Sequence, residues 1–211
     1  MPNYVHHTFE GGGIAIWHIT ETSDELYALL GMPCYDAQLL AKKNESRRAE
    51  WLAVRLLVKE LFGSECEVAY HPTGRPYLKN GTAHISISHT KGFAAVAYHH
   101  DAPIGMDIEY ISSRVERIAP RFTTQVEASY IDVHDEHARQ MYHLINWSAK
   151  EALYKLFDSP SLAEFKEVFH IAPYTLGECG AMDAMVCGAE NTILAVSYLT
   201  FPYFVCTWAV L

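Results

Sequence analysis

Two carboxylates that alternate with apolar residues carry the clearest chemical signal in the sequence. They are Asp107 and Glu109, within residues 104–110 (IGMDIEY). Alternation with a period of two predicts a strand that places both carboxylates on one face and residues 104, 106 and 108 on the other. Two carboxylates about 6–7 Å apart along a strand repel each other unless a cation lies between them, and oxygen ligands suit a hard ion such as Mg²⁺. A half-exposed strand with a solvated acidic face is the alternative.

A second charged pair lies on the helix that we predict over residues 140–157. Glu151 and Lys155 are four positions apart, so they share one face of that helix. Trp147 and Ser148 border the same stripe, which therefore need not face solvent. An ordinary surface ion pair would have the same spacing, so the pair alone does not establish a catalytic role.

Basic residues are concentrated in one segment of an acidic chain. The net charge is −9, yet residues 42–59 contain six bases and two acids. Arg48, Arg55 and Lys59 share one stripe of the helix predicted over residues 44–62. The pattern favours a local anion site over a general nucleic-acid surface, and a solvated helix face is the alternative. Aromatic residues do not alternate with these bases as they do in proteins that bind single strands.

The remaining patterns predict an α+β fold of two similar halves, residues 1–103 and 104–211, each a long helix packed on a small antiparallel sheet. Ser23 is the expected N-cap of a short first helix that Gly31 ends, and Gly63 is the expected stop of the helix over residues 44–62. Further helices are expected at 113–122, 125–133 and 140–157, the last closed by residues 158–160. Strands are expected at 14–19, 67–70, 77–78, 84–88, 93–98, 104–110, 163–176, 192–200 and 203–210.

Apolar runs and cysteines bear on the expected compartment. The apolar runs are of strand length, so we expect no membrane segment. Residues 1–17 lack the pattern of a signal peptide, so we expect none. The five cysteines have no regular spacing, which favours free thiols in a reducing compartment over disulfides or a zinc site. The expectation is a cytoplasmic protein.

Four motifs resemble those of the 4′-phosphopantetheinyl transferases and occur along this chain in the same order as in that family. The resemblance is to the larger monomeric, pseudo-dimeric type that activates surfactin synthetase, and it covers about residues 42–157. Residues 105–109 (GMDIE) resemble the family's G-x-D-x-E, and residues 147–155 (WSAKEALYK) resemble its W-x-x-K-E-x-x-x-K. Residues 74–76 (GRP) with 88–90 (SHT), and Arg121-Phe122 leading to Glu127, resemble two further family segments.

The resemblance implies a function and a set of partners. It implies transfer of the 4′-phosphopantetheine group of coenzyme A to a serine of an apo acyl- or peptidyl-carrier protein, with release of adenosine 3′,5′-bisphosphate. Mg²⁺ and coenzyme A would lie in a cleft between the two halves of a monomer. The implied partners include neither nucleic acid nor a membrane.

The same resemblance implies roles for individual residues. Asp107, Glu109 and Glu151 would hold Mg²⁺ against the pyrophosphate, with Glu151 as the base for the serine, either directly or through a water. Lys155 would stabilise or protonate the leaving group. The nucleotide phosphates would be bound by Arg75, Ser88, His89 and one or both of Arg47 and Arg48, with Lys42 and Lys43 as open alternatives.

One departure and two other functions limit this reading. Many relatives continue with G-K-G-L after the second lysine, whereas this chain has LFDSPSL at residues 156–162, so any contact made by the lysine of G-K-G-L is missing. The same carboxylates could also serve a Mg²⁺-dependent nucleotide pyrophosphohydrolase. A non-catalytic module that binds coenzyme A or a carrier protein is the third possibility.

Overall fold

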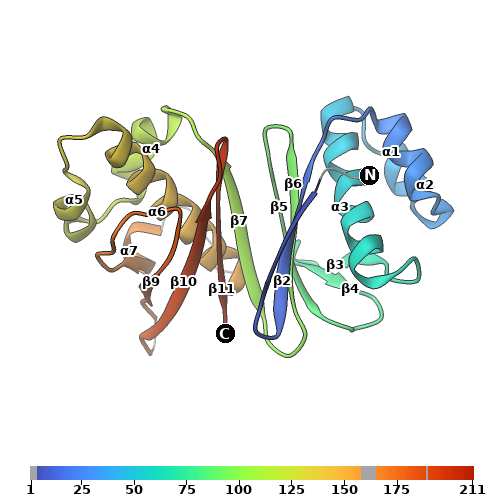
Figure 1. The fold of residues 1–211 in the computed structure, drawn as a ribbon. Helices are drawn as coiled ribbons and strands as arrows, with labels where there is room; N and C mark the ends of the chain where they lie inside the picture. Colours follow the sequence, from blue (N-terminus) through green and yellow to red (C-terminus); the bar gives the residue numbers. More distant parts are fainter. Residues whose placement is uncertain (1–3, 158–164, 189) are drawn as a thin grey trace. The chain divides into compact units, whose positions relative to one another are not determined.

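The computed structural model describes residues 4–157, 165–188 and 190–211 of the chain. It divides into two compact units, Met1–Asp101 and Ala102–Leu211 (Figure 1). Helices and antiparallel sheets occur in both units, which confirms the α+β class. The arrangement of two halves implied by the resemblance stays a prediction, as does a domain boundary after residue 103. The expected helix stop at residues 158–160 and the start of the expected strand at 163–176 lie outside the described residues.

The first unit contains a four-stranded antiparallel sheet in the order β1-β2-β6-β5 and a separate two-stranded ribbon of β3 and β4. Strands from the beginning of the unit therefore pair with strands from its end. Its elements are β1 (Tyr4–Phe9), β2 (Gly12–His18), α1 (Ser23–Leu30), η1 (Pro33–Tyr35), α2 (Asp36–Leu40), α3 (Glu45–Phe62), β3 (Val68–Tyr70), β4 (Pro76–Leu78), β5 (His84–Thr90) and β6 (Phe93–His99).

Strand β1 is an element that the sequence does not predict. It pairs with β2 through a turn at Gly11, whose φ of 73° suits glycine. None of residues 5–9 is buried, so β1 has no apolar face and no alternation to reveal it.

The start of α1 corrects one expectation. The N-cap is Thr22 and not Ser23: the Thr22 hydroxyl accepts from the Glu25 backbone N–H, and the Glu25 carboxylate accepts from the Thr22 N–H. Ser23 lies inside the helix and donates to both carboxylate oxygens of Glu45, at 2.7 and 2.8 Å. Gly31 ends the helix in the left-handed conformation, as expected.

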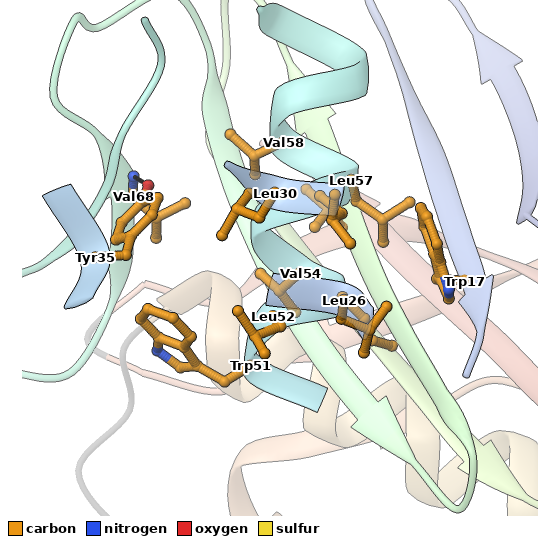
Figure 2. Close-up of a cluster of buried hydrophobic side chains, with 14 of the residues drawn as sticks. Trp17, Leu26, Leu30, Tyr35, Trp51, Leu52, Val54, Leu57, Val58 and Val68 are labelled. Atoms are coloured by element: carbon orange, nitrogen blue, oxygen red, sulfur yellow. Dashed lines mark hydrogen bonds between the residues drawn. The ribbon is translucent and has the colours of Figure 1, made fainter. Parts of the chain in front are cut away.

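Helix α3 forms the centre of the first core (Figure 2). Asn44 caps its start and Gly63 its end, which confirms the helix expected over residues 44–62. Leu52 and Leu57 are fully buried in this core, and Leu57 lies beside Trp17 of β2. Burial of each such leucine contributes about 1.5–3 kcal/mol relative to exposure.

Two of the three residues of the basic stripe of α3, Arg55 and Lys59, form neither the expected anion site nor a solvated face. Arg55 is only 2% exposed and its guanidinium lies 3.9 Å from the centre of the Trp51 ring. Lys59 donates to the carbonyl oxygens of Leu29 and Leu30, at 3.2 and 2.8 Å, so it caps the C-terminal end of α1. The expectation is wrong for these two residues because this stripe of α3 packs against α1 and η1.

The second unit contains a five-stranded antiparallel sheet in the order β7-β11-β10-β9-β8. Helix α6 covers one face of it (Figure 1). Its elements are β7 (Ile104–Tyr110), α4 (Arg114–Phe122), α5 (Gln125–Ile131), α6 (Glu136–Phe157), α7 (Phe165–Val168), β8 (Phe169–Ile171), β9 (Cys179–Val186), β10 (Thr192–Thr200) and β11 (Phe204–Val210).

Two expectations for the second unit are corrected. The strand expected at 163–176 is, in its described part, the short helix α7 followed by the three residues of β8. Strand β9 was not expected, although Met182, Ala184 and Val186 alternate with residues that are not fully buried. The apolar residues of β9 are small or flexible and so give only a weak strand signal.

Glycine at position 105 allows α6 to lie very close to β7. A Cβ built there would overlap the carbonyl oxygen of Ala152 and would stand 2.7 Å from the Cβ of Leu156. Residues two apart on a strand share a face, so Asp107 and Glu109 also face α6. The face of β7 that carries Asp107 and Glu109 is therefore the face on which α6 packs. From the sequence alone, the same face could equally have been exposed to solvent.

Two observations bear on the expected compartment. Among the described residues, no helix has the length and apolarity needed to cross a membrane. The five cysteines are free thiols, with Cys66 and Cys206 buried.

We expect Gly105→Ala to destabilise the protein by about 3 kcal/mol, the upper part of the usual range for overpacking, because backbone of α6 cannot move aside as a side chain can. Urea unfolding of the variant against wild type measures this. Gly188→Ala is the control, since a Cβ there meets nothing closer than 3.7 Å. Equal stability of the Gly105 variant and wild type would contradict the close approach.

Candidate active site

Strand β7 and helix α6 bring together the acidic and basic residues that the sequence singled out in this half. Asp107 is only 5% exposed, and its Oδ1 accepts from Lys155 Nζ at 2.8 Å. The same ammonium donates to the carbonyl oxygen of Met106 at 3.1 Å. The charges of Glu109 and Glu151 also interact with those of Asp107 and Lys155. The structure thus gathers Asp107, Glu109, Glu151 and Lys155 within one unit.

Trp147 holds Glu109 in place. The indole N–H donates to Glu109 Oε1 at 2.8 Å. The indole itself packs against Phe122 and Phe165, with ring centres 5.0 and 5.6 Å away. A bulky, aromatic donor therefore fixes one carboxylate oxygen of the cluster, a role that the sequence did not assign to Trp147.

In the first unit, the structure brings Arg47 and His89 together. Arg47 Nη1 lies 3.3 and 3.4 Å from the two ring nitrogens of His89. It also donates to Glu50 at 3.0 Å, and Glu50 lies 3.6 Å from His89 Nδ1. The Arg47 side chain is 63% exposed and that of His89 43% exposed, so both remain accessible to an anion in solution.

The other residues expected to bind phosphate do not share this contact. Arg48 lies 3.8 Å from Asp24. Ser88 is buried, and since neighbouring residues of a strand point to opposite faces, its side chain points away from that of His89. Arg75 is partly exposed and follows Gly74, whose positive φ of 92° shapes the turn between β3 and β4.

Residues 103–179 match the model of the 4′-phosphopantetheinyl transferase superfamily. No curated protein matches the chain. The matched range, called the transferase segment below, contains Asp107, Glu109, Glu151 and Lys155, and the match supports phosphopantetheine transfer as the general activity. Arg47, Arg48, Arg75, Ser88 and His89 lie outside it, so their roles stay predictions.

Burial and like charge perturb the carboxylates of the transferase segment. Burial and the charge of Asp107 raise the pKa of Glu109 from its ordinary value of 4.5 to about 6. The same two causes, partly offset by Lys155, raise the pKa of Glu151 to about 7. One ammonium therefore does not compensate three neighbouring carboxylates.

The donor set fits a hard cation, because it consists of carboxylate oxygens whose mutual repulsion a divalent ion would relieve. Asp107, Glu109 and Glu151 are the residues that would hold it. Within residues 4–157, 165–188 and 190–211, however, no group of three or more Asp, Glu, His or Cys side chains is arranged so that it could hold a metal ion. Lys155 occupies Asp107 Oδ1 instead. The Mg²⁺ site stays a prediction.

The transferase segment also contains a buried ion pair that sequence reasoning missed. Lys150 and Glu127 are both fully buried, 2.9 Å apart. Lys150 also donates to the carbonyl oxygen of Phe122 at 2.6 Å. Glu127 accepts from the backbone N–H groups of Thr124 and Ile171, at 2.7 and 2.8 Å. The pair joins α4, α5, α6 and β8. The sequence feature that could have revealed it is the presence together of the two family motifs that contain Glu127 and Lys150.

Two hollows in the second unit differ in their relation to the carboxylates. A hollow of about 820 Å³ is lined mainly by apolar groups of α5, α7, β8, β9 and β10, and none of the four site residues lines it. A smaller one of about 140 Å³ lies beside Glu109 and Trp147, with Arg114 on its wall. Of these two hollows, the smaller one is lined by a site carboxylate, Glu109, and the larger one by none, so volume alone does not locate the site.

We expect Lys150→Met to lower the free energy of unfolding by about 3–5 kcal/mol, because it leaves Glu127 as an uncompensated buried charge. Denaturant unfolding measures the loss. Lys166→Met is the control, since Lys166 is an exposed lysine of the same unit. Similar small effects of the two substitutions would contradict a role of Lys150 in holding the segment together.

The raised pKa of Glu151 predicts a pH-dependent stability in metal-free buffer. A folded-state pKa of about 7 against an ordinary value of 4.5 means that the stabilisation from the bound proton is complete below pH 4.5 and is lost as the pH rises through 7. Glu151→Gln has no such loss. Its free energy of unfolding should therefore rise relative to wild type between pH 4.5 and 8, by up to about 3 kcal/mol.

Urea unfolding at several pH values in the presence of a chelator tests this expectation. Glu178→Gln serves as the control because it makes the same substitution at an exposed glutamate of this unit. A stability difference between Glu151→Gln and wild type that does not change with pH would show that Glu151 titrates normally.

Proposed function

We propose that this protein transfers the 4′-phosphopantetheine group of coenzyme A to a serine of an apo acyl- or peptidyl-carrier protein, with Mg²⁺, and releases adenosine 3′,5′-bisphosphate. The observation that carries the proposal is the cluster of Asp107, Glu109, Glu151 and Lys155 inside the transferase segment. Three carboxylates and one lysine provide the ligands for a hard cation, a base and a cation for a phosphate leaving group.

Glu151 is the group that we propose as the base. A pKa of about 7 leaves a large fraction of its carboxylate free to accept a proton at neutral pH, and a pKa near the working pH is what general-base catalysis favours. The serine oxygen would attack the β-phosphorus of coenzyme A while its proton passes to Glu151, directly or through a water. The bond from this phosphorus to the bridging oxygen would break, and adenosine 3′,5′-bisphosphate would leave.

Lys155 would stabilise the charge on that leaving group. Its side chain is 27% exposed, so its ammonium can exchange Asp107 for a phosphate oxygen without crossing a packed core. Mg²⁺ held by Asp107, Glu109 and Glu151 would supply charge neutralisation at the pyrophosphate when bound. Asp107 and Lys155 would in this way also contribute to coenzyme A binding.

For the nucleotide phosphates we propose Arg47 and His89 together, with Arg75, Ser88 and Arg48 as further contacts. The contact between Arg47 and His89 supports this choice among the bases of residues 42–48. Arg48 is engaged with Asp24, and the ammonium of Lys42 lies 5.7 Å from the Trp51 ring. A guanidinium suits two-pronged contact with phosphate.

The proposal includes a monomer acting in the cytoplasm. The five free thiols support a reducing compartment. The two proposed substrates are coenzyme A and a carrier protein, so the proposed reaction involves neither nucleic acid nor a membrane surface.

We expect incubation with coenzyme A, Mg²⁺ and an apo-carrier protein to add one phosphopantetheine group to the carrier, as measured by intact mass. Glu151→Gln should lower kcat by about 10²-fold or more, the usual scale for a general base. Asp107→Ala should abolish nearly all Mg²⁺-dependent transfer, and Lys155→Ala should weaken both turnover and coenzyme A affinity. Glu178→Gln, an exposed site, is the control.

Other outcomes of this assay identify other functions. Hydrolysis of coenzyme A without any carrier present would identify a pyrophosphohydrolase. Binding of coenzyme A or carrier that survives loss of Lys155, with no covalent product, would identify a binding module. Near wild-type transfer by Asp107→Ala would overturn the site.

We also expect the protein to bind coenzyme A at least 10-fold more tightly than 3′-dephospho-coenzyme A, since a charge-assisted hydrogen bond contributes on the order of 1.5–3 kcal/mol. His89→Ala, Arg47→Ala and Arg75→Ala should each reduce this ratio in calorimetric titrations. Lys79→Ala is the control, because Lys79 pairs with Glu67 at the surface. Equal affinity of wild type for the two ligands would show that these residues do not recognise the 3′-phosphate.

A further inference from the structure

Two buried hydroxyl groups lie against Asp107, the carboxylate at the centre of the cluster. Thr207 on β11 is directly opposite Asp107 on β7, so both side chains point to the sheet face that α6 covers. Ser148 of α6 lies between them: its Oγ is 3.0 Å from Asp107 Oδ2 and 2.9 Å from Thr207 Oγ1. Ser148 and Thr207 both have zero exposure.

The number of hydroxyl protons available fixes the direction of the hydrogen bonds among Thr207, Ser148 and Asp107. An ionised carboxylate only accepts hydrogen bonds, so Ser148 donates its single hydroxyl proton to Asp107. The bond between the two hydroxyls therefore has Thr207 as the donor and Ser148 as the acceptor. The order is Thr207 to Ser148 to Asp107.

The two carboxylate oxygens of Asp107 have different kinds of hydrogen-bond partner. Oδ2 accepts from a hydroxyl that is fully buried and held by the sheet and the helix. Oδ1 accepts from Lys155, whose side chain is 27% exposed and ends on a flexible stem. If the lysine moves to another anion, the hydroxyl chain still holds Oδ2, and Oδ1 keeps its direction.

A serine inside a helix usually faces solvent or donates to the carbonyl four residues earlier. Ser148 instead donates its hydroxyl proton to Asp107, which the close approach of α6 to β7 brings within reach. Groups that orient the ligands of a metal typically change metal affinity or activity by about 10–100-fold when removed.

We propose that Thr207 and Ser148 are positioning residues that orient Asp107 so that its Oδ1 can bind a divalent cation once Lys155 releases it. This inference rests on the proposed function, because it concerns the same cation. Neither hydroxyl touches a reacting atom; both act through Asp107.

The test measures cation binding directly, with Mn²⁺ as the probe and the loss of the free-ion paramagnetic resonance signal as the readout. Thr207→Val removes the first donor while it keeps the side-chain shape, and we expect about 10-fold weaker Mn²⁺ binding. Ser148→Ala should weaken binding by at least as much. Thr207→Ser keeps the hydroxyl, so its Mn²⁺ affinity should stay within about 3-fold of wild type, a smaller change than the loss expected when a group that orients a metal ligand is removed.

Thr123→Val is a matched control, because it makes the same chemical change at another buried threonine of this unit. The Thr123 hydroxyl has no hydrogen-bond partner in the part of the chain that the structure describes, so its loss should leave Mn²⁺ binding and thermal stability unchanged or slightly improved. Carrier modification is measured in parallel over a range of Mg²⁺ concentrations. For Thr207→Val we expect the Mg²⁺ concentration for half-maximal rate to rise more than kcat falls.

The outcomes separate this inference from the proposed function. If wild type binds Mn²⁺ and modifies the carrier, but Thr207→Val loses only thermal stability with unchanged Mn²⁺ affinity, the hydroxyls are merely structural and the inference fails alone. If wild type binds no Mn²⁺ and transfers nothing, the proposed function fails and the inference fails with it. Weaker Mn²⁺ binding by Thr207→Val and Ser148→Ala, with recovery in Thr207→Ser, supports it.

Discussion

The close approach of α6 to β7 is the constraint on which the second unit depends. At Gly105 the strand presents no side chain, so the backbone of α6 can rest almost directly on it. Short side chains can then meet across the gap: the Ser148 hydroxyl reaches Asp107, and Trp147 reaches Glu109. A larger residue at position 105 would separate helix and strand, and every one of these contacts would lengthen together. The glycine thus determines the reach of all the groups around it.

The second unit contains two clusters of buried charge that differ in their balance. Around Glu127, one carboxylate meets Lys150 and two backbone N–H groups, so its oxygens are satisfied and the cluster serves structure. Around Asp107, three carboxylates share one ammonium, and the pKa values of Glu109 and Glu151 are raised. A charge-balanced cluster gains little stability from binding an ion. A cluster with excess negative charge is stabilised most by a ligand of opposite charge, which is why such perturbed pKa values indicate a functional site.

Features that depend on local pattern could be predicted from the sequence. The alternation around Asp107 gave the strand, and Asn44 and Gly63 gave the ends of the longest helix of the first unit. The grouping of Asp107 with Lys155 could be expected only through the motif resemblance, because no local pattern predicts a contact between residues 48 positions apart.

Features that depend on burial could not be predicted in the same way. From the sequence, Arg55 and Lys150 are charged residues on amphipathic helices. In the structure, Arg55 packs on the Trp51 ring and Lys150 pairs with Glu127. Strand β1 has no buried face to produce a pattern, and Thr207 looked like any polar residue of a strand until its partner across the sheet was known. In each case a contact distant in sequence decides the outcome.

The ion pair between Lys155 and Asp107 bears on the order of folding and metal binding. The chain supplies its own positive charge to the most buried of the three carboxylates, so the fold itself compensates the negative charge of Asp107. Under the proposed function, Mg²⁺ would bind to a second unit that is already folded, and removal of the metal would abolish activity without loss of the fold.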